Sequence, residues 1–159
     1  MKTLITLTFF SFLFISCGKE VVPDRTEACD GSSAENCECF KATNRERVNK
    51  DLPAFNYCMS CFKMAQEHAD DMAKYNYFSH DRAAVSGRPA ETFAARAGRF
   101  GLGWGAGENI ASGSSGSGAV AQWMASPGHK ANILNPSFKS FACGYNGGLS
   151  VQVFSAGQQ

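Results

Sequence analysis

The chain has 159 residues, of which 44% are hydrophobic and 18% are charged, and its formal net charge is +1. These values predict one globular domain with an ordinary core and exclude a disordered chain. Removal of a leader that contains Lys2 would lower the Lys plus Arg count from 15 to 14, equal to the 14 acidic residues. Because no basic run stands out, nothing electrostatic recruits nucleic acid or an acidic membrane surface, and we expect no nucleic-acid partner.

Residues 1–17 predict an export signal. Lys2 supplies a positive start, and the apolar and hydroxyl-bearing run from Leu4 to Ile15 is too short to span a bilayer. The run ends in the sequence FISCG at residues 14–18, which resembles a bacterial lipobox and predicts acylation of Cys17. Ordinary cleavage after a small residue is the alternative. Two or three acyl chains on one residue would form a stable membrane anchor.

Of the seven cysteines, six remain once Cys17 is set aside, and an even number in an exported chain predicts three disulfides. The six are Cys29, Cys37, Cys39, Cys58, Cys61 and Cys143. A zinc site built from Cys37, Cys39, Cys58 and Cys61 is the alternative. We expect Cys58 and Cys61 to share a helix one turn apart, where a mutual disulfide would be strained. The expected pairing therefore joins Cys37 and Cys39 to Cys58 and Cys61, and Cys29 to Cys143, although spacing alone does not fix it.

The first half of the chain predicts a tether and two helices. Residues 18–38 lack an apolar period and predict a polar tether, with the domain over 39–159. A first helix is expected over 39–49, ended by Leu52 and Pro53. The second, from Phe62 to Ala73, has apolar residues at spacings of three and four. Inside it, His68 is expected on the solvent-facing or boundary side, without a chemical role. Just past its end, His80 either caps the last carbonyls or belongs to a site.

The second half predicts further helices and a closing hairpin. Residues 88–97 favour a helix that begins at Pro89. The glycine-rich stretch 98–110 lacks the Lys-Ser/Thr of a phosphate loop and predicts mobile backbone around Glu108. A Ser/Gly loop at 112–118 precedes a helix over 119–125. Residues 138–145 and 149–154 flank an Asn-Gly-Gly turn and predict a hairpin. Helices first and strands mostly last indicate an α+β layered domain.

The stretch from Ser126 to Leu134 predicts both a helix start and a chemical site. Ser126 can cap a helix through its side-chain oxygen, and Pro127 suits the first helical position. His129 then lies in the first turn, near the positive end of the helix dipole, where the neutral imidazole that binds metals or accepts protons is favoured. The alternative is that His129 only packs under a tryptophan.

Several sequence blocks occur in order over about residues 40–156. They are Asn44-x-x-Arg47, the helix 65–73 leading to Tyr77-Phe78-Ser79-His80, Gly107-Glu108-Asn109-Ile110-Ala111, Trp123-x-x-Ser126-Pro127-Gly128-His129-x-x-Asn132-Ile133-Leu134, and Gly144-Tyr145. Together they resemble the CAP superfamily, or SCP-like extracellular domains, in its short bacterial form. The resemblance implies a three-layer α-β-α sandwich whose central cleft carries two histidines and two acidic residues. By matching blocks, His80, Glu108 and His129 take three of these places. Between Asn109 and His129 there is no acid, and Gln122 would be a weak, uncharged substitute.

Two imidazoles and one carboxylate can hold a divalent metal such as zinc with open water positions, at modest affinity because one ligand is missing. The first hypothesis is a lipid-anchored binding or interaction module whose cleft or surface holds a lipid, glycan, peptide or envelope protein. Gly18 directly after Cys17 favours the outer membrane or cell surface by analogy, and a secreted protein is the alternative to an anchored one.

The alternative function is a metal-dependent hydrolase, such as a protease, with Glu108 as base and the histidines as metal ligands. The missing second acid, the absence of His-Glu-x-x-His from the sequence and the lack of a free cysteine nucleophile count against it. A third possibility is a purely structural role in the envelope, which would give His80, Glu108 and His129 no chemical function.

Overall fold

A computed structural model describes residue 29 and residues 32–157, except residue 86. The predicted export signal at 1–17, the predicted lipidation site Cys17 and most of the predicted tether lie outside the described residues. The end of that tether is helical instead, because α1 (Ala34–Val48) already begins at residue 34. Ser33 caps this helix, and its side chain accepts a hydrogen bond from the backbone N–H of Asn36. The folded domain therefore starts before residue 39, where the sequence predicted its boundary.

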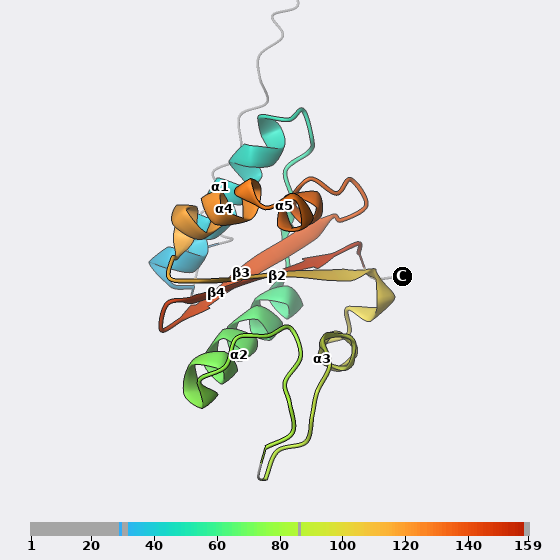
Figure 1. The fold of residues 1–159 in the computed structure, drawn as a ribbon. Helices are drawn as coiled ribbons and strands as arrows, with labels where there is room; N and C mark the ends of the chain where they lie inside the picture. The colour runs from blue at the N-terminus through green and yellow to red at the C-terminus, as the bar shows by residue number, and fades with distance from the viewer. Residues whose placement is uncertain (1–28, 30–31, 86, 158–159) are drawn as a thin grey trace, which may run out of the picture.

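A four-stranded sheet lies between two layers of helices (Figure 1). Its strands are β1 (Asn56–Tyr57), β2 (Ala106–Ser112), β3 (Ser140–Asn146) and β4 (Leu149–Ser155), in the order β1-β3-β4-β2. β1 runs parallel to β3, and the other pairs are antiparallel. Helices α1, α4 (Gly116–Ala125) and α5 (Pro127–Ile133) cover one face, and α2 (Met59–Tyr75) and α3 (Phe93–Arg99) cover the other. The predicted α+β fold, a three-layer α-β-α sandwich, is confirmed.

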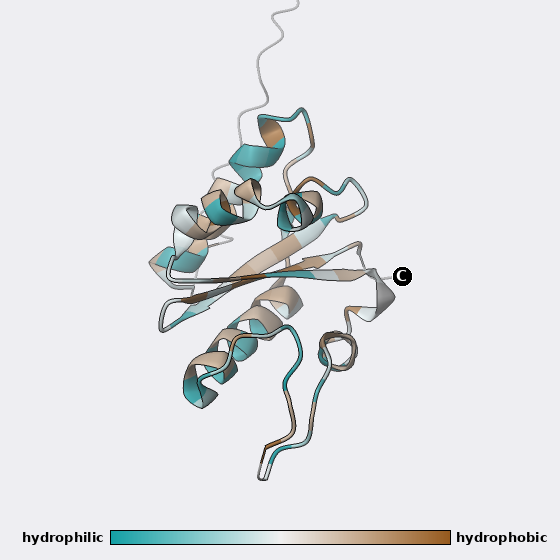
Figure 2. Ribbon diagram, in the orientation of Figure 1, coloured by the Kyte–Doolittle hydropathy of each residue, from teal (hydrophilic) through white to brown (hydrophobic). Residues whose placement is uncertain are grey.

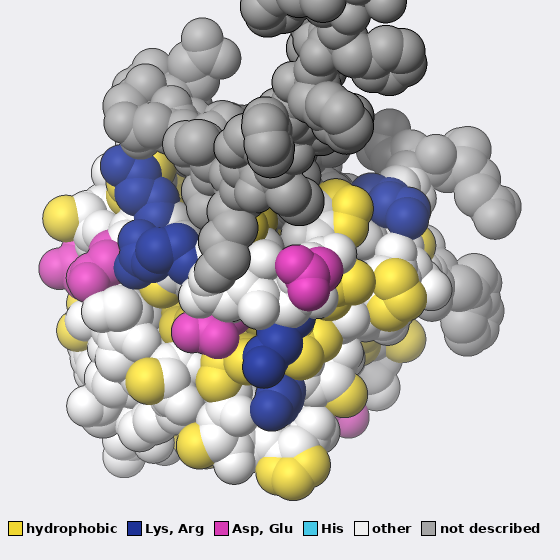
Figure 3. All heavy atoms as spheres, turned by 90° about the horizontal axis from the view of Figure 1, so that it is seen from above, with side chains coloured by type: hydrophobic (Ala, Val, Ile, Leu, Met, Phe, Trp, Pro, Cys, Tyr) yellow, Lys and Arg dark blue, Asp and Glu magenta, His cyan; other side chains and the backbone are white. Residues whose placement is uncertain are grey.

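The two faces of the sheet carry separate hydrophobic clusters, as the period of two along a strand requires. On β4, Phe154 faces the α1, α4 and α5 layer, whereas Val151 and Val153 face α2. Trp123 of α4 is the largest side chain buried in the first cluster, and Met64 and Met72 of α2 fill the second. Figure 2 shows hydrophobic segments along the strands, interrupted by hydrophilic ones. On the face seen in Figure 3, basic and acidic side chains lie interspersed with apolar ones.

The β3–β4 hairpin turns at Gly147 and Gly148, as predicted, and both glycines adopt positive φ. β3 also lies against α2 at Gly144, where a Cβ would overlap the backbone of the helix. Glycine is therefore required at this position for close approach of strand and helix.

The predicted disulfide pairing is wrong, although all six cysteines do form disulfides. The pairs are Cys29–Cys37, Cys39–Cys143 and Cys58–Cys61. Cys58 is not helical: it is the N-cap of α2 with extended backbone (φ −126°, ψ 105°), so its Cα lies 5.1 Å from that of Cys61. This distance is within the ordinary range for a disulfide. Because every one of these thiols is oxidised, the alternative zinc site is not formed.

Three local predictions also need correction. The helix expected over 88–97 is α3, which begins only at Phe93, because Arg82 pairs with Glu91 in an isolated β-bridge and Thr92 caps the helix. The glycine-rich stretch is not mobile around Glu108: a short 3₁₀ turn, η2 (Gly103–Gly105), leads into β2, which pairs with β4 along its whole length. α5 begins at Pro127 as predicted, but the Ser126 side chain makes no capping hydrogen bond.

Within the part of the chain that the structure describes, no helix is both long and apolar enough to cross a membrane.

Candidate functional site

The candidate site is centred on Glu108, which β2 directs into the layer of α2 and α3. Its side chain is 1% exposed and lies beside the buried Arg96 of α3. Arg96 Nη2 donates to Glu108 Oε2 at 2.9 Å and to Oε1 at 3.2 Å. The same nitrogen donates to the carbonyl oxygen of His80 at 2.9 Å. Because a buried charged group needs a partner, Arg96 and Glu108 serve as each other's counterion inside the domain.

His80 completes this cluster from the loop that follows α2. Its Nδ1 lies 2.9 Å from Glu108 Oε1, while 49% of its side chain remains exposed. The hydrogen bond to Glu108 raises the pKa of His80 above the usual histidine value, in spite of partial burial. Since Nδ1 is directed at the carboxylate, Nε2 is the ring atom left for a ligand. The predicted juxtaposition of His80 and Glu108 is therefore present.

His68 is a member of the cluster that the sequence prediction placed wrongly. It is 1% exposed on the inner face of α2, and its Nε2 lies 2.9 Å from the carbonyl oxygen of Ser79 and 3.9 Å from Glu108 Oε1. Desolvation lowers the pKa of His68, which favours the neutral ring. A neutral ring with its proton on Nε2 donates to Ser79 and thereby holds the backbone next to His80.

An ion-pair network holds the loop that carries His80. Asp71 of α2 accepts a hydrogen bond from Tyr77 Oη at 2.6 Å and pairs with Arg88. Arg82 lies 3.3 Å from Glu91, which joins the two sides of the loop. Burial and the bond to Asp71 raise the pKa of Tyr77, which keeps its proton and donates to the carboxylate. The network ties the loop to α2 near its C-terminal end.

His129 approaches from the opposite helical layer, held by an amide network. Asn109, next to Glu108 on β2, donates to the His129 carbonyl oxygen at 3.1 Å. Asn132 of α5 donates to Asn109 Oδ1 at 2.9 Å and to the Glu108 carbonyl oxygen at 3.3 Å. Burial and the charge of the nearby His80 lower the pKa of His129, so its neutral form is favoured, as predicted. His129 is half-buried rather than enclosed under Trp123, whose Nε1 donates to Ile110.

The geometry does not fit the predicted three-ligand metal set of His80, Glu108 and His129. Both oxygens of Glu108 are engaged by Arg96, and one of them also by His80. Among the described residues, no group of three or more His, Cys, Asp or Glu side chains is arranged to hold a metal ion. Gln122, considered as a substitute for the missing acid, is exposed and lies 3.4 Å from the Ser112 carbonyl oxygen. Only the two imidazoles remain as candidate ligands.

Arg96 was not predicted as part of the site, and His68 was expected on the wrong side of α2, although the sequence carries a signal for its burial. His68 follows Met64 and Ala65 by four and three residues, so it shares their inner face on α2. No comparable pattern marked Arg96, which lies in a helix of seven residues.

The chain belongs to the CAP family. A family model described as the cysteine-rich secretory protein family matches residues 40–155, well over half of the chain. The uncharacterised protein YkwD of Bacillus subtilis is 34% identical over 133 residues, which are 81% of this chain and 50% of that protein. The chain thus spans about half the length of the curated relative that it matches.

Solved structures agree with this assignment. An extracellular protein of Bacillus anthracis that contains an SCP domain is 31% identical, with a TM-score of 0.68 over 79% of this chain and 40% of that one. An outer surface protein of Borrelia burgdorferi is 18% identical, with a TM-score of 0.61, and the match covers 72% of this chain and 86% of that one. A cysteine-rich secretory protein of Staphylococcus aureus is 14% identical, with a TM-score of 0.59, and the match covers 76% of this chain and 37% of that one. The last two share the fold alone.

Proposed function

We propose that this chain is an exported CAP-domain protein that acts as a ligand-binding or interaction module of the bacterial cell envelope, anchored by lipid at Cys17. The disulfides support export, because such bonds persist mainly in oxidising compartments. The name of the similar Bacillus anthracis structure, an extracellular protein that contains an SCP domain, points in the same direction. Anchoring at Cys17 rests on the lipobox-like sequence at 14–18.

The engagement of Glu108 is the observation that favours binding over catalysis. A general base needs a free lone pair within reach of the proton that it takes. Here the carboxylate accepts from Arg96 and His80 and is closed off from solvent. Glu108 therefore orients His80 instead of facing a substrate. What the cluster offers to a ligand is the outward edge of His80, beside the half-buried His129.

Two imidazole edges can donate to or accept from hydroxyl, carbonyl and carboxylate groups, which lipids, glycans and peptides all carry. A divalent metal such as zinc would find two nitrogen ligands here, one fewer than the three protein ligands of ordinary catalytic zinc sites, so we expect weak binding. Two remaining water positions on such an ion could also be taken by a ligand.

The alternative function, a metal-dependent hydrolase, is favoured by the same hydrogen bond between His80 and Glu108. A carboxylate on one imidazole nitrogen increases the basicity of the other, as it does beside many metal-bound histidines. In this geometry His80 and His129 would hold the metal through their free ring nitrogens, and Glu108, which Arg96 engages, would orient His80 instead of acting as the base.

The test combines calorimetric zinc titration with NMR of the histidine ring signals, on the chain and on its His80→Ala and His129→Ala variants. Vesicles of phosphatidylglycerol and phosphatidylethanolamine, peptidoglycan fragments and an unfolded peptide serve as ligands. We expect one ligand class to shift the His80 and His129 signals without being cleaved, and His80→Ala to abolish the effect. Zinc-dependent cleavage of the peptide that is lost in both variants would contradict the proposal and establish the hydrolase.

A further inference from the structure

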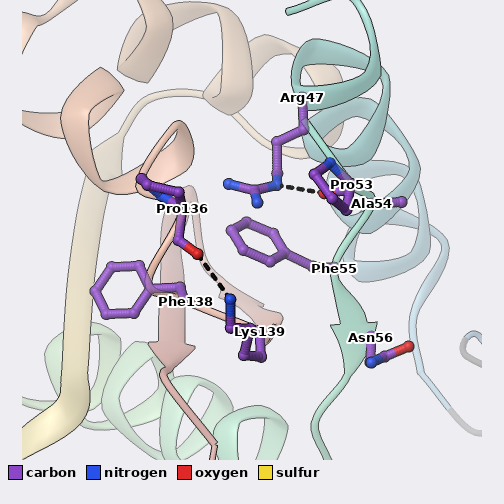
Figure 4. Close-up of a pocket in the computed structure, with 8 residues that line it drawn as sticks. All are labelled: Arg47, Pro53, Ala54, Phe55, Asn56, Pro136, Phe138 and Lys139. Atoms are coloured by element: carbon purple, nitrogen blue, oxygen red, sulfur yellow. Dashed lines mark hydrogen bonds between the residues drawn. The ribbon is translucent and has the colours of Figure 1, made fainter. Parts of the chain in front are cut away.

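A cavity lies where the end of α1 meets the segment that precedes β3. It has a volume of about 430 Å³ and contains none of the residues of the His80–Glu108–Arg96 cluster. Its walls are Arg47, Pro53, Ala54, Phe55, Asn56, Pro136, Phe138 and Lys139 (Figure 4). Two of these residues are cationic and two are aromatic, whereas none is acidic.

Arg47 is the main feature of the cavity. The residue is 2% exposed, and its guanidinium carbon lies 3.5 Å from the centre of the Phe55 ring. Nε donates to the Pro53 carbonyl oxygen at 2.9 Å, and Nη1 donates to the carbonyl oxygens of Ile133 (2.8 Å) and Asn135 (3.0 Å). These bonds brace α1 against the end of α5. They use three of the five N–H donors of the guanidinium.

The two hydrogens on Nη2 are the donors that remain. Within the described part of the chain, no acceptor binds them and no carboxylate forms an ion pair with Arg47. Figure 4 shows the guanidinium directed into the space between Pro136 and Phe55. A buried cation without a counterion is unfavourable, and desolvation accordingly lowers the pKa of Arg47 to about 10. An anion in the cavity would relieve this imbalance.

Lys139 supplies a second cation on the opposite wall. Its side chain is exposed, and Nζ donates to the Pro136 carbonyl oxygen at 2.9 Å. An ammonium group has three N–H donors, so others remain for a ligand. Phe55 and Phe138, 1% and 8% exposed, form the apolar walls. Phe55 is fixed in place because Asn44 bonds to both its N–H and its carbonyl oxygen.

We propose that this cavity binds a small organic anion, with a carboxylate between Arg47 and Lys139 and a flat apolar group against Phe55 and Phe138. The remaining NH₂ group and the ammonium each meet one oxygen of a carboxylate, whereas the third oxygen of a phosphate would meet no further cationic group in the cavity. The site is independent of the function proposed above, because it shares no residue with that cluster.

Benzoate is the test ligand, since it combines a carboxylate with a flat ring, and benzamide is its neutral counterpart of nearly the same shape. Both are titrated into the full chain, with binding followed by calorimetry and by NMR of the Phe138 ring and the Lys139 amide. We expect benzoate to bind at least about tenfold more tightly than benzamide. Phenyl phosphate is titrated in parallel, and we expect it to bind more weakly than benzoate.

Variants of Lys139 test the proposal, because this exposed side chain can be replaced without loss of the fold. Lys139→Gln should weaken benzoate binding by about fivefold, the usual worth of one partly exposed charge. Lys139→Arg should retain binding, and Lys63→Gln, an exposed lysine of α2 on the other side of the sheet, should leave it unchanged. Equal binding of benzamide, no saturable binding of benzoate, full binding by Lys139→Gln, or tighter binding of phenyl phosphate would each overturn the proposal.

Discussion

Replacement of Glu108 by glutamine should destabilise the domain strongly, because it leaves a buried guanidinium without its counterion. The side chains of Arg96 and Glu108 are 2% and 1% exposed, and two of the hydrogen bonds of Arg96 end on this carboxylate. Removal of one partner from a buried ion pair costs about 3–5 kcal/mol. Glutamine keeps the shape of glutamate, so the change isolates the charge. Urea unfolding, followed by far-UV circular dichroism, measures the free energy of unfolding.

Glu67 provides the matched control. It pairs with Arg99 at the surface, where the two side chains are 45% and 44% exposed. An exposed pair contributes about 0–1 kcal/mol, so Glu67→Gln should change the free energy of unfolding little. A double variant, Arg96→Met with Glu108→Leu, should be more stable than Glu108→Gln alone, because no buried charge is left unpaired. A loss below about 1 kcal/mol for Glu108→Gln, comparable to that of Glu67→Gln, would refute this reasoning.

Three further predictions concern protonation, packing and disulfides. In an NMR titration, the ring of His80 should titrate above the usual histidine pKa, and those of His68 and His129 below it. His68 stays neutral in the folded chain, whereas the unfolded chain gains a proton at this residue. Its contribution to the free energy of unfolding should therefore fall as the pH drops below about 6.5. Thermal melts of the wild type and of a His68→Gln variant over this pH range measure the effect, and the absence of a steeper decline in the wild type would contradict it. Gly144→Ala should lower the free energy of unfolding, measured in urea, by about 3 kcal/mol, because the new Cβ overlaps the α2 backbone. A decrease below about 1 kcal/mol would show that β3 and α2 move apart easily. Alanine replacement of the disulfide between α1 and β3, whose cysteines are 104 residues apart, should cost about 5 kcal/mol, against about 2 kcal/mol for the disulfide at the start of α2. Equal losses for the two disulfides would rule out chain entropy as the reason.

Local pattern and chain chemistry predicted most of the elements. The period of three and four along α2, the Asn-Gly turn between β3 and β4, and Pro127 at the first position of α5 each act within one stretch of chain, so sequence alone specified them. Where the predictions were wrong, the outcome depended on a neighbour elsewhere in the fold. The stretch around Glu108 contains many glycines, yet it is a regular strand because β4 supplies its hydrogen-bond partners.

Part of the candidate site was likewise predicted from the sequence, and part depended on contacts in the fold. The family resemblance identified His80, Glu108 and His129, and the structure places His80 and Glu108 in direct contact. No sequence pattern predicted Arg96 as the counterion, because the pair joins a helix residue to a strand residue twelve positions further along the chain. With that arginine in place, the carboxylate orients a histidine and is not a free ligand.

The sequence by itself determined the family, the layered fold and the oxidation of the cysteines, because these follow from short motifs, hydrophobic periodicity and the cysteine count. The tertiary structure alone decided which cysteines pair, which histidine is buried and which charges meet. Cys58 pairs with Cys61 because its backbone is extended at the helix N-cap, and His68 is buried because the loop after α2 folds back over it. Tertiary packing also decides the surroundings of Arg47. Carbonyl oxygens of α5 and of the loop after α1 accept its hydrogen bonds, and no carboxylate among the described residues reaches it.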